Sequence, residues 1–89
     1  MNATNTMQGR RIFPDDGGQF DHLAPGDYFK HPTMPGVWVI RDPAGHLGSL
    51  QTHTVVEHED GTITVSPSIL DPKPGGWHGY LERGVWREA

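Results

Sequence analysis

Apolar and polar side chains alternate over short runs of this chain, a pattern that indicates strands rather than helices. The longest such run is HTVVEHEDGTITVSPSIL, from His53 to Leu70. Asp60-Gly61 interrupts the alternation, and an Asp-Gly pair between two apolar runs favours a two-residue type I′ turn. A turn centred there predicts a hairpin in which Val56 lies opposite Val65. Pro67 is expected to end or bend the second strand.

This register divides the hairpin into two faces, because successive side chains in a strand point to opposite sides. The predicted core face carries Thr54, Val56, His58, Ile63 and Val65. The predicted polar face carries Val55, Glu57, Glu59, Thr62 and Thr64. The acidic residues and histidines that crowd together in the sequence are therefore separated in space. His53 and His58 fall on opposite faces and should not share one metal ion without a bulge between them.

Three shorter runs predict strands before this hairpin, and prolines and glycines border them. They are Arg10–Phe13, Asp27–Lys30 and Val37–Arg41. The third is apolar on both faces, which is typical of a strand that is covered on both sides. The stretch HLGSLQ, residues 46–51, fits either a loop or a helical turn.

The segment WHGYLERGVWRE predicts a second hairpin that turns at Arg83-Gly84. This turn places Leu81 opposite Trp86 and Tyr80 opposite Arg87. Leu81 and Trp86 should form a cross-strand pair in the core. With the other runs, the pattern predicts a mainly β protein: a small antiparallel sheet, curled or sandwich-like, of about six or seven short strands with little or no helix.

The composition supports this fold class and a single domain. Gly 12 and Pro 8 among 89 residues are too many for long helices and suit short strands joined by turns. Residues 1–9 are expected to form a polar N-terminal arm, and residues 10–89 a single small β domain. An ordered arm has to lie against its own domain or a neighbouring subunit, which suggests a homo-oligomer.

Charge and hydropathy exclude several classes of function. The formal net charge is −4 and the few basic residues are scattered, so binding to nucleic acid is not expected. No apolar run approaches the ~20 residues of a membrane span. The absence of cysteine rules out disulfides and thiolate metal sites and suits a reducing compartment.

No residue combination in the sequence predicts catalysis. Ser66-Pro67-Ser68 lacks a nucleophile elbow, and its hydroxyls fit a role at a strand end. Asp15-Asp16 lie in a Gly-rich turn, and Glu57 and Glu59 on a polar strand face, without the apolar pocket that tunes paired carboxylates. We therefore predict no catalytic residue, no cofactor and a non-enzymatic protein.

Histidines from different elements leave a metal site geometrically open. His46, His53 and His78 are the candidates. The alternative is that all three are partly exposed or hydrogen-bonded side chains, and on that interpretation the protein holds no metal.

Aromatic and basic residues are the candidates for binding a protein partner. Trp77 follows two glycines and would be an anchor if its indole is exposed, with His78 and Tyr80 beside it. Arg10 and Arg11, next to the polar arm, could form a second contact.

The chain from His53 to its end resembles a group of uncharacterised small proteins of actinobacterial bacteriophages. Those proteins carry an HTV-EHEDGTITVSPSI hairpin and a WHGYLERGVWR ending. The group is similar to a bacterial domain of unknown function, often zinc-binding, in which a TLSPSI strand precedes a Cys-His-Phe-Phe stretch and an Arg-Asp-Gly turn. Trp77 stands where that domain has a cysteine, and only His78 matches a ligand position.

The resemblance implies a non-enzymatic phage accessory protein that acts in the host cytoplasm by binding a host protein or itself. A virion structural protein, as decoration or minor capsid component, is the first alternative. The second is a histidine-based metal-binding domain linked to ubiquitin-like or defence systems, since some relatives occur beside ubiquitin-like conjugation genes.

Overall fold

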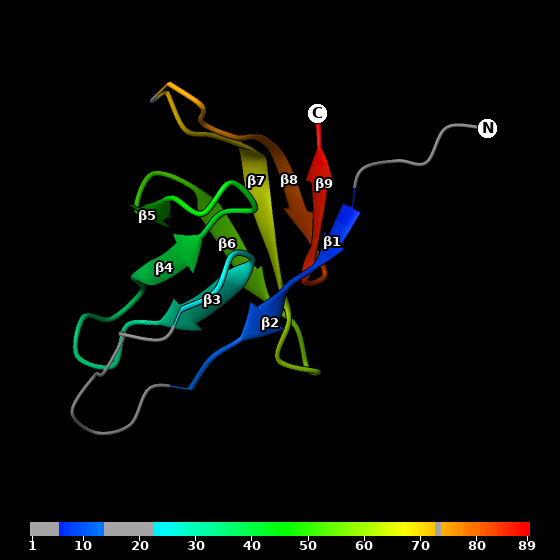
Figure 1. Cartoon of the computed structure of the whole chain (residues 1–89). Coiled ribbons are helices and arrows are strands. Elements are labelled where there is room, and N and C mark those ends of the chain that lie inside the picture. The colour runs from blue at the N-terminus through cyan, green and yellow to red at the C-terminus, as the bar shows by residue number, and fades with distance from the viewer. Residues whose placement is uncertain (1–5, 14–22, 73) are drawn as a thin grey trace.

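Nine short strands form two sheets that face each other (Figure 1). The structure, a computed structural model, describes residues 6–13, 23–72 and 74–89. The five-stranded sheet contains, in spatial order, β1 (Thr6–Gln8), β9 (Val85–Glu88), β8 (His78–Glu82), β7 (Ile63–Leu70) and β6 (Thr54–Glu57). The four-stranded sheet contains β2 (Arg10–Arg11), β3 (Asp27–Lys30), β4 (Trp38–Arg41) and β5 (Leu47–Ser49). Neighbouring strands are antiparallel except for β2 and β3.

The predicted fold class is confirmed, with two strands more than expected. The described part of the chain contains no helix, and therefore none that is long and apolar enough to span a membrane. One extra strand, β1, comes from the predicted polar arm, and the other, β5, from the stretch 46–51. The predicted strand over 27–30 agrees residue for residue with β3. Residues 1–5 of the arm and the predicted turn at 15–18 lie outside the described residues.

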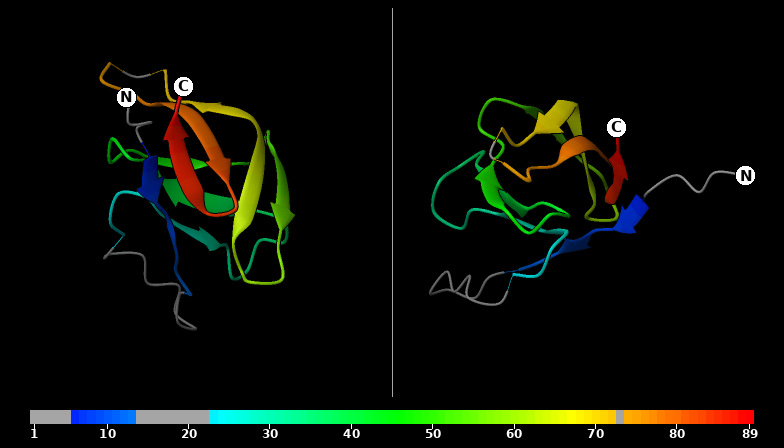
Figure 2. Two further views of the ribbon diagram at one scale, coloured as in Figure 1. Left: turned by 90° about the vertical axis from the view of Figure 1, so that its right-hand side faces the viewer. Right: turned by 45° about the horizontal axis from the view of Figure 1, so that its top comes forward.

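Gly9 lets the chain pass from one sheet into the other. β1 pairs with β9, and β2 begins after this single residue in the opposite sheet (Figure 2). The Gly9 N–H donates to the Gly84 carbonyl at 2.8 Å. A Cβ at Gly9 would lie 2.6 Å from that carbonyl oxygen, so a larger residue does not fit. Residues 6–8 therefore lie against their own domain, and their order gives no support to a homo-oligomer.

The core lies between the two sheets and is dominated by aromatic residues. Trp86 and Leu81 are fully buried and lie opposite each other, which confirms the predicted cross-strand pair. Trp77 packs edge-on against Trp86, with ring centroids 5.4 Å apart. The Trp86 indole N–H donates to the Gly26 carbonyl at 2.9 Å, so its polar atom is satisfied inside the core.

The predicted register of the first hairpin is wrong by one residue. Val55, rather than Val56, lies opposite Val65. A one-residue shift moves every side chain of a strand to the other face. Val55 accordingly packs against the core, and Val56 is 50% exposed. The faces of the second strand agree with the prediction, since Ile63 and Val65 are buried.

The loop of this hairpin is longer than a two-residue turn. The His58 N–H donates to the Thr62 carbonyl, and the Gly61 N–H donates to the His58 carbonyl. His58 is therefore not on the core face beside Ile63 as predicted. Its Nε2 is 2.7 Å from the hydroxyl of Thr64. β7 continues through Pro67, and its pairing with β8 shifts between Val65 and Ile69, so the strand is irregular there rather than ended.

Candidate functional site

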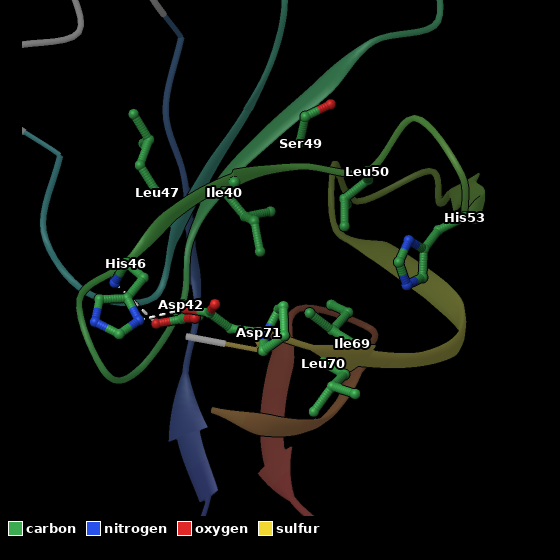
Figure 3. A pocket seen from close by; sticks show the side chains of 12 residues that line it. Ile40, Asp42, His46, Leu47, Ser49, Leu50, His53, Ile69, Leu70 and Asp71 are labelled. Atoms are coloured by element: carbon green, nitrogen blue, oxygen red, sulfur yellow. Dashed lines mark hydrogen bonds and ion pairs between the residues drawn. The ribbon is translucent and has the colours of Figure 1, made fainter. Parts of the chain in front are cut away.

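A cleft of about 230 Å³ lies between the two sheets, where the turn after β4 approaches the end of β7 (Figure 3). Its apolar lining includes the buried side chains of Ile40, Leu50 and Ile69. Leu47 and Leu70 border it and are 54% and 63% exposed. Its polar lining includes Asp42, His46, Asp71 and His53. An apolar cavity with a few converging polar groups is the usual form of a binding site.

Two Asp-Pro pairs position the carboxylates of the cleft. Asp42 directly follows β4 and Asp71 directly follows β7, and proline comes next in both places. A residue before proline is held in an extended conformation, and the proline cannot donate to a further ladder bond. Each strand therefore ends with an aspartate at the same side of the molecule, one from each sheet.

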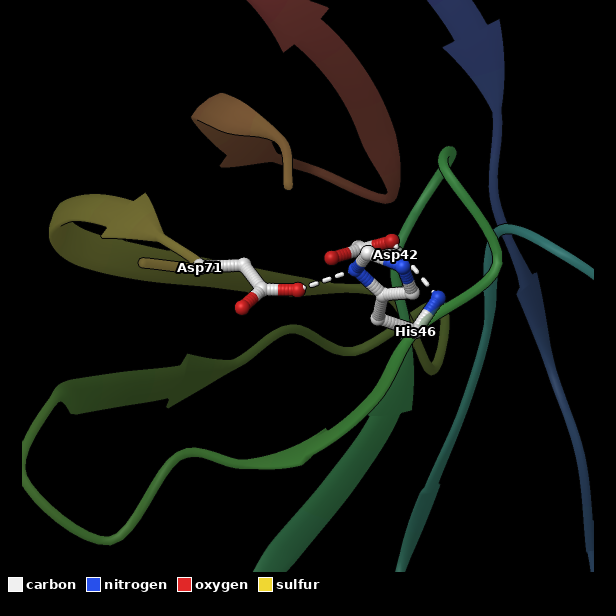
Figure 4. A group of neighbouring side chains, drawn as sticks. All are labelled: Asp42, His46 and Asp71. Carbon is white, nitrogen blue, oxygen red and sulfur yellow. Dashed lines mark hydrogen bonds and ion pairs between the residues drawn. The ribbon is translucent and has the colours of Figure 1, made fainter. Parts of the chain in front are cut away.

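The turn between β4 and β5 fixes His46 beside these carboxylates. The N–H of Asp42 donates to the His46 carbonyl at 2.9 Å, and the N–H of His46 donates to Oδ1 of Asp42, also at 2.9 Å. The imidazole Nδ1 of His46 is hydrogen-bonded to Oδ2 of Asp71 (Figure 4). One potential ligand atom from each of Asp42, His46 and Asp71 lies within 4.8 Å of the other two. We call these three residues the Asp-His-Asp cluster.

Asp42 is the most deeply buried member of the Asp-His-Asp cluster, at 3% exposed. Within the described residues, no lysine or arginine forms an ion pair with it. The neighbouring Arg41 donates instead to the Gly45 carbonyl at 2.7 Å. Burying a carboxylate costs free energy unless an opposite charge or a metal ion compensates it. The cluster therefore concentrates negative charge at one end of the cleft.

His53 stands on the wall of the cleft opposite His46 (Figure 3). Its Nε2 is 3.1 Å from the Ser68 carbonyl. A carbonyl can only accept, so this nitrogen donates the hydrogen bond. Nδ1 is buried and has no hydrogen-bond partner among the described residues. The backbone of β7 thus holds His53 at the wall of the cleft.

The three candidate histidines do not form one metal site. His46 bonds to Asp71, whereas Nε2 of His78 is 3.2 Å from the hydroxyl of Ser68, whose carbonyl His53 contacts. Of the three, only His46 belongs to the group of possible ligands that the described residues assemble.

The side chain of Trp77 does not meet the condition set for a partner anchor, because it is 9% exposed and packs on Trp86. His78 is exposed, and Tyr80 is half-buried on the outer face of the five-stranded sheet. The Arg87 guanidinium lies 4.4 Å from the centre of the Tyr80 ring. His78 and Tyr80 thus both belong to β8, whereas Trp77 precedes this strand and is buried in the core.

Arg10 and Arg11 form ion pairs within the domain, and the second partner contact predicted for them stays a prediction. Nη1 of Arg11 donates to Glu57 at 2.7 Å and to the Gly61 carbonyl at 3.0 Å, and so ties β2 to the opposite sheet. The hydrogen bond from Arg11 lowers the pKa of Glu57. Arg10 forms an ion pair at 3.0 Å with Asp27, and the hydrogen bond to this carboxylate raises the pKa of Arg10.

The sequence prediction named two histidines of the cleft but missed Asp42, Asp71, Leu47 and Leu70. The available signal was the repeated Asp-Pro pair after an apolar strand.

No protein-family model, curated protein or solved structure matches the chain. The resemblance of residues 53–89 to small phage proteins therefore stays a prediction.

Proposed function

We propose that this protein is a non-catalytic binding domain that holds an extended segment of a protein partner along β5 and the adjoining cleft. The resemblance to small phage proteins supports an accessory protein that acts on a host protein in the host cytoplasm. The observation that carries the proposal is the combination of an edge strand with an apolar cavity beside it. This surface replaces Trp77 as the partner site.

β5 has hydrogen-bonding groups available for another strand. It is the last strand of its sheet, with β4 as its neighbour. His46 and Leu50 bond to the β4 side through their carbonyl and N–H groups. Since bonding directions alternate in an antiparallel pair, the backbone groups of Leu47 and Ser49 point away from β4. A partner segment can pair with these groups, as in other cases of strand addition.

The cleft can accept a side chain from such a segment. Its volume of about 230 Å³ exceeds the ~150 Å³ of an apolar cavity that binds benzene. Alternate residues of an added strand point to opposite faces of the sheet. One set would enter the cleft near Ile40 and Leu50, and the other would lie beside the exposed Leu47 on the outer face.

β6, an edge strand of the five-stranded sheet, is less suited to pairing with a partner segment. It carries Glu57, which forms ion pairs with Arg11 at 2.7 Å and Lys30 at 3.5 Å. Inward-pointing charges of this kind protect edge strands from adding a further strand. The two edges thus provide a test site and a matched control.

Selection from a displayed peptide library tests the proposal. We expect enriched peptides with apolar residues at alternating positions. Leu47→Asp and Ser49→Pro should reduce peptide retention at least ~10-fold, because central apolar contacts and backbone bonds dominate such binding. The control Val56→Asp, on the edge strand β6, should bind like the wild type. No enrichment, or equal loss in the control, would overturn the proposal.

Affinity purification from the natural host then identifies the partner. A captured protein supports the proposal when it contains the selected sequence pattern, is retained by Val56→Asp and is lost with Leu47→Asp. Capture by all variants alike counts against it.

A further inference from the structure

We infer that Asp42, His46 and Asp71 form a binding site for a divalent transition-metal ion such as Zn²⁺, at the polar end of the cleft. The inference goes beyond peptide binding and does not depend on it. The Asp-His-Asp cluster joins the ends of β4 and β7, so a bound ion would connect the two sheets (Figure 4).

The spacing of the three side chains suits such an ion. Zinc lies about 2.0–2.2 Å from histidine nitrogen and carboxylate oxygen, which places neighbouring ligands about 3.4 Å apart in a tetrahedral site. The candidate ligand atoms already lie within 4.8 Å of one another. The ligand atoms are therefore close to the separation that a bound ion requires.

The charges of the cluster also favour a cation. Asp42 is 3% exposed and accepts a bond from the N–H of His46, while the guanidinium of Arg41 turns to Gly45. The Asp71 carboxylate approaches the same point from the other sheet. A divalent ion would offset the charge of the buried Asp42, since buried charges are commonly paired or bound to a metal.

His46 is held in a position that suits a ligand. Its backbone N–H and carbonyl both bond to Asp42, so the turn fixes the residue from both sides. The Nδ1 atom faces Asp71. An ion would take the place of the hydrogen between Nδ1 and the carboxylate. Imidazole and carboxylate donors together suit zinc, manganese, iron, cobalt or nickel more than calcium or copper(I).

The site opens into the cleft, because Asp42, His46 and Asp71 all line it. Three protein ligands leave at least one coordination position for water or another group. His53 lines another part of the same cavity. His78, which the resemblance singles out as a ligand position, takes no part in this site.

Metal titration of the full chain without a histidine tag tests the inference. After chelator treatment and desalting, Zn²⁺ should bind with saturation at one equivalent in calorimetry, and Co²⁺ should give the absorption of a nitrogen- and oxygen-ligated ion. Asp71→Asn and His46→Gln should each weaken binding by at least ~10-fold. Asp60→Asn and His58→Gln are matched controls in a distant loop and should leave binding unchanged.

Lack of saturable binding of zinc, cobalt, manganese and nickel would overturn the inference, as would equal weakening by the control variants. If the site variants are poorly folded, the imidazole NMR signals of the wild-type protein show whether zinc binds at the Asp-His-Asp cluster. Zinc should shift the His46 signals before those of His58 and His78, and a shift confined to the latter would refute the site. Repeating the peptide selection with chelator present separates failure of the metal site from failure of the peptide site.

Discussion

The two hairpins of the five-stranded sheet turn on similar pairs of residues and yet differ in register. In the β8–β9 hairpin, Arg83 and Gly84 both have positive φ, +47° and +77°. The two-residue turn follows, with Leu81 opposite Trp86 as the sequence predicts. In the β6–β7 hairpin, Gly61 has a φ of +90° but Asp60 is not in the positive region. The loop lengthens to residues 58–62, and the register shifts by one.

The difference teaches that the side chain before the glycine decides the turn. Oδ1 of Asp60 accepts bonds from the N–H of Thr62 at 2.9 Å and from its hydroxyl at 2.6 Å. Such local bonds to aspartate compete with regular hairpin pairing. Arg83 has no acceptor in its side chain, and its own N–H donates to the hydroxyl of Thr64 at 3.0 Å. An Asp-Gly pair is therefore a weaker signal for register than for the existence of a turn.

The largest expected difference between the hairpins concerns their buried and exposed apolar residues. Trp86→Ala should lower the free energy of unfolding by about 4 kcal/mol, because it empties the centre of the core and removes the bond to Gly26. Val56→Ala should change it by less than about 0.5 kcal/mol. Urea unfolding of both variants measures this, and similar losses would contradict the described packing.

A second experiment tests the register of the first hairpin directly. Val55→Asp should cost about 2 kcal/mol, because it introduces a carboxylate against the core. Val56→Asp should cost less than about 1 kcal/mol, since that position is half exposed. Urea unfolding again gives the values. The reverse order of costs would restore the register that the sequence suggests.

The two turn glycines should respond differently to alanine. A Cβ at Gly84 would lie 2.9 Å from Cγ2 of Thr62 and 3.0 Å from the Tyr28 hydroxyl. Gly84→Ala combines this crowding with an unfavourable φ and should cost about 2–3 kcal/mol. A Cβ at Gly61 would meet its nearest atom, on Arg11, at 3.9 Å, so only the φ cost of about 1–2 kcal/mol applies. Equal thermal midpoints for the two variants would contradict the turn geometries.

The smallest expected effect is a loss of stability at low pH. The hydrogen bond from Arg11 lowers the pKa of Glu57, and the bonds from Thr62 lower the pKa of Asp60. Ionised, both carboxylates stabilise the folded state above their ordinary pKa values of 4.5 and 3.8, and this stability is lost as pH falls through the lowered values. Unfolding midpoints from pH 6 downward should fall less steeply in Glu57→Gln than in the wild type. A parallel decline would show that Glu57 does not contribute.

Local chemistry made part of the fold predictable. β3 is bordered by prolines and a glycine, and the residue before the glycine of the β8–β9 turn has no side-chain acceptor that could bond to the turn. Both elements therefore follow from the sequence. The residues of β1 are exposed throughout and show no alternation; only their partner β9 makes them a strand. Trp77 is buried because Gly79 leaves room for its indole: a Cβ there would lie 2.3 Å from the ring. That fit exists only after strands have paired.

The candidate site was likewise predictable from the sequence only in part. His46 is recognisable from its residue type alone. Asp42 and Asp71 read as ordinary turn residues, because each stands before a proline at the end of a strand. Their proximity arises from the packing of two sheets, and no local pattern encodes which strand ends will meet. Two apolar strands that both end in Asp-Pro were the only hint.

The crossing at Gly9 has a consequence for the order of folding. β1 is synthesised well before its partner β9, since Met7 pairs with Trp86. Closing so long a loop is slow, because its entropy is lost before the contacts form. Until Val85–Glu88 emerge, both β1 and β8 have an unpaired edge. The five-stranded sheet is therefore complete only once β9 is present, and a chain stalled before β9 would expose both edges to aggregation.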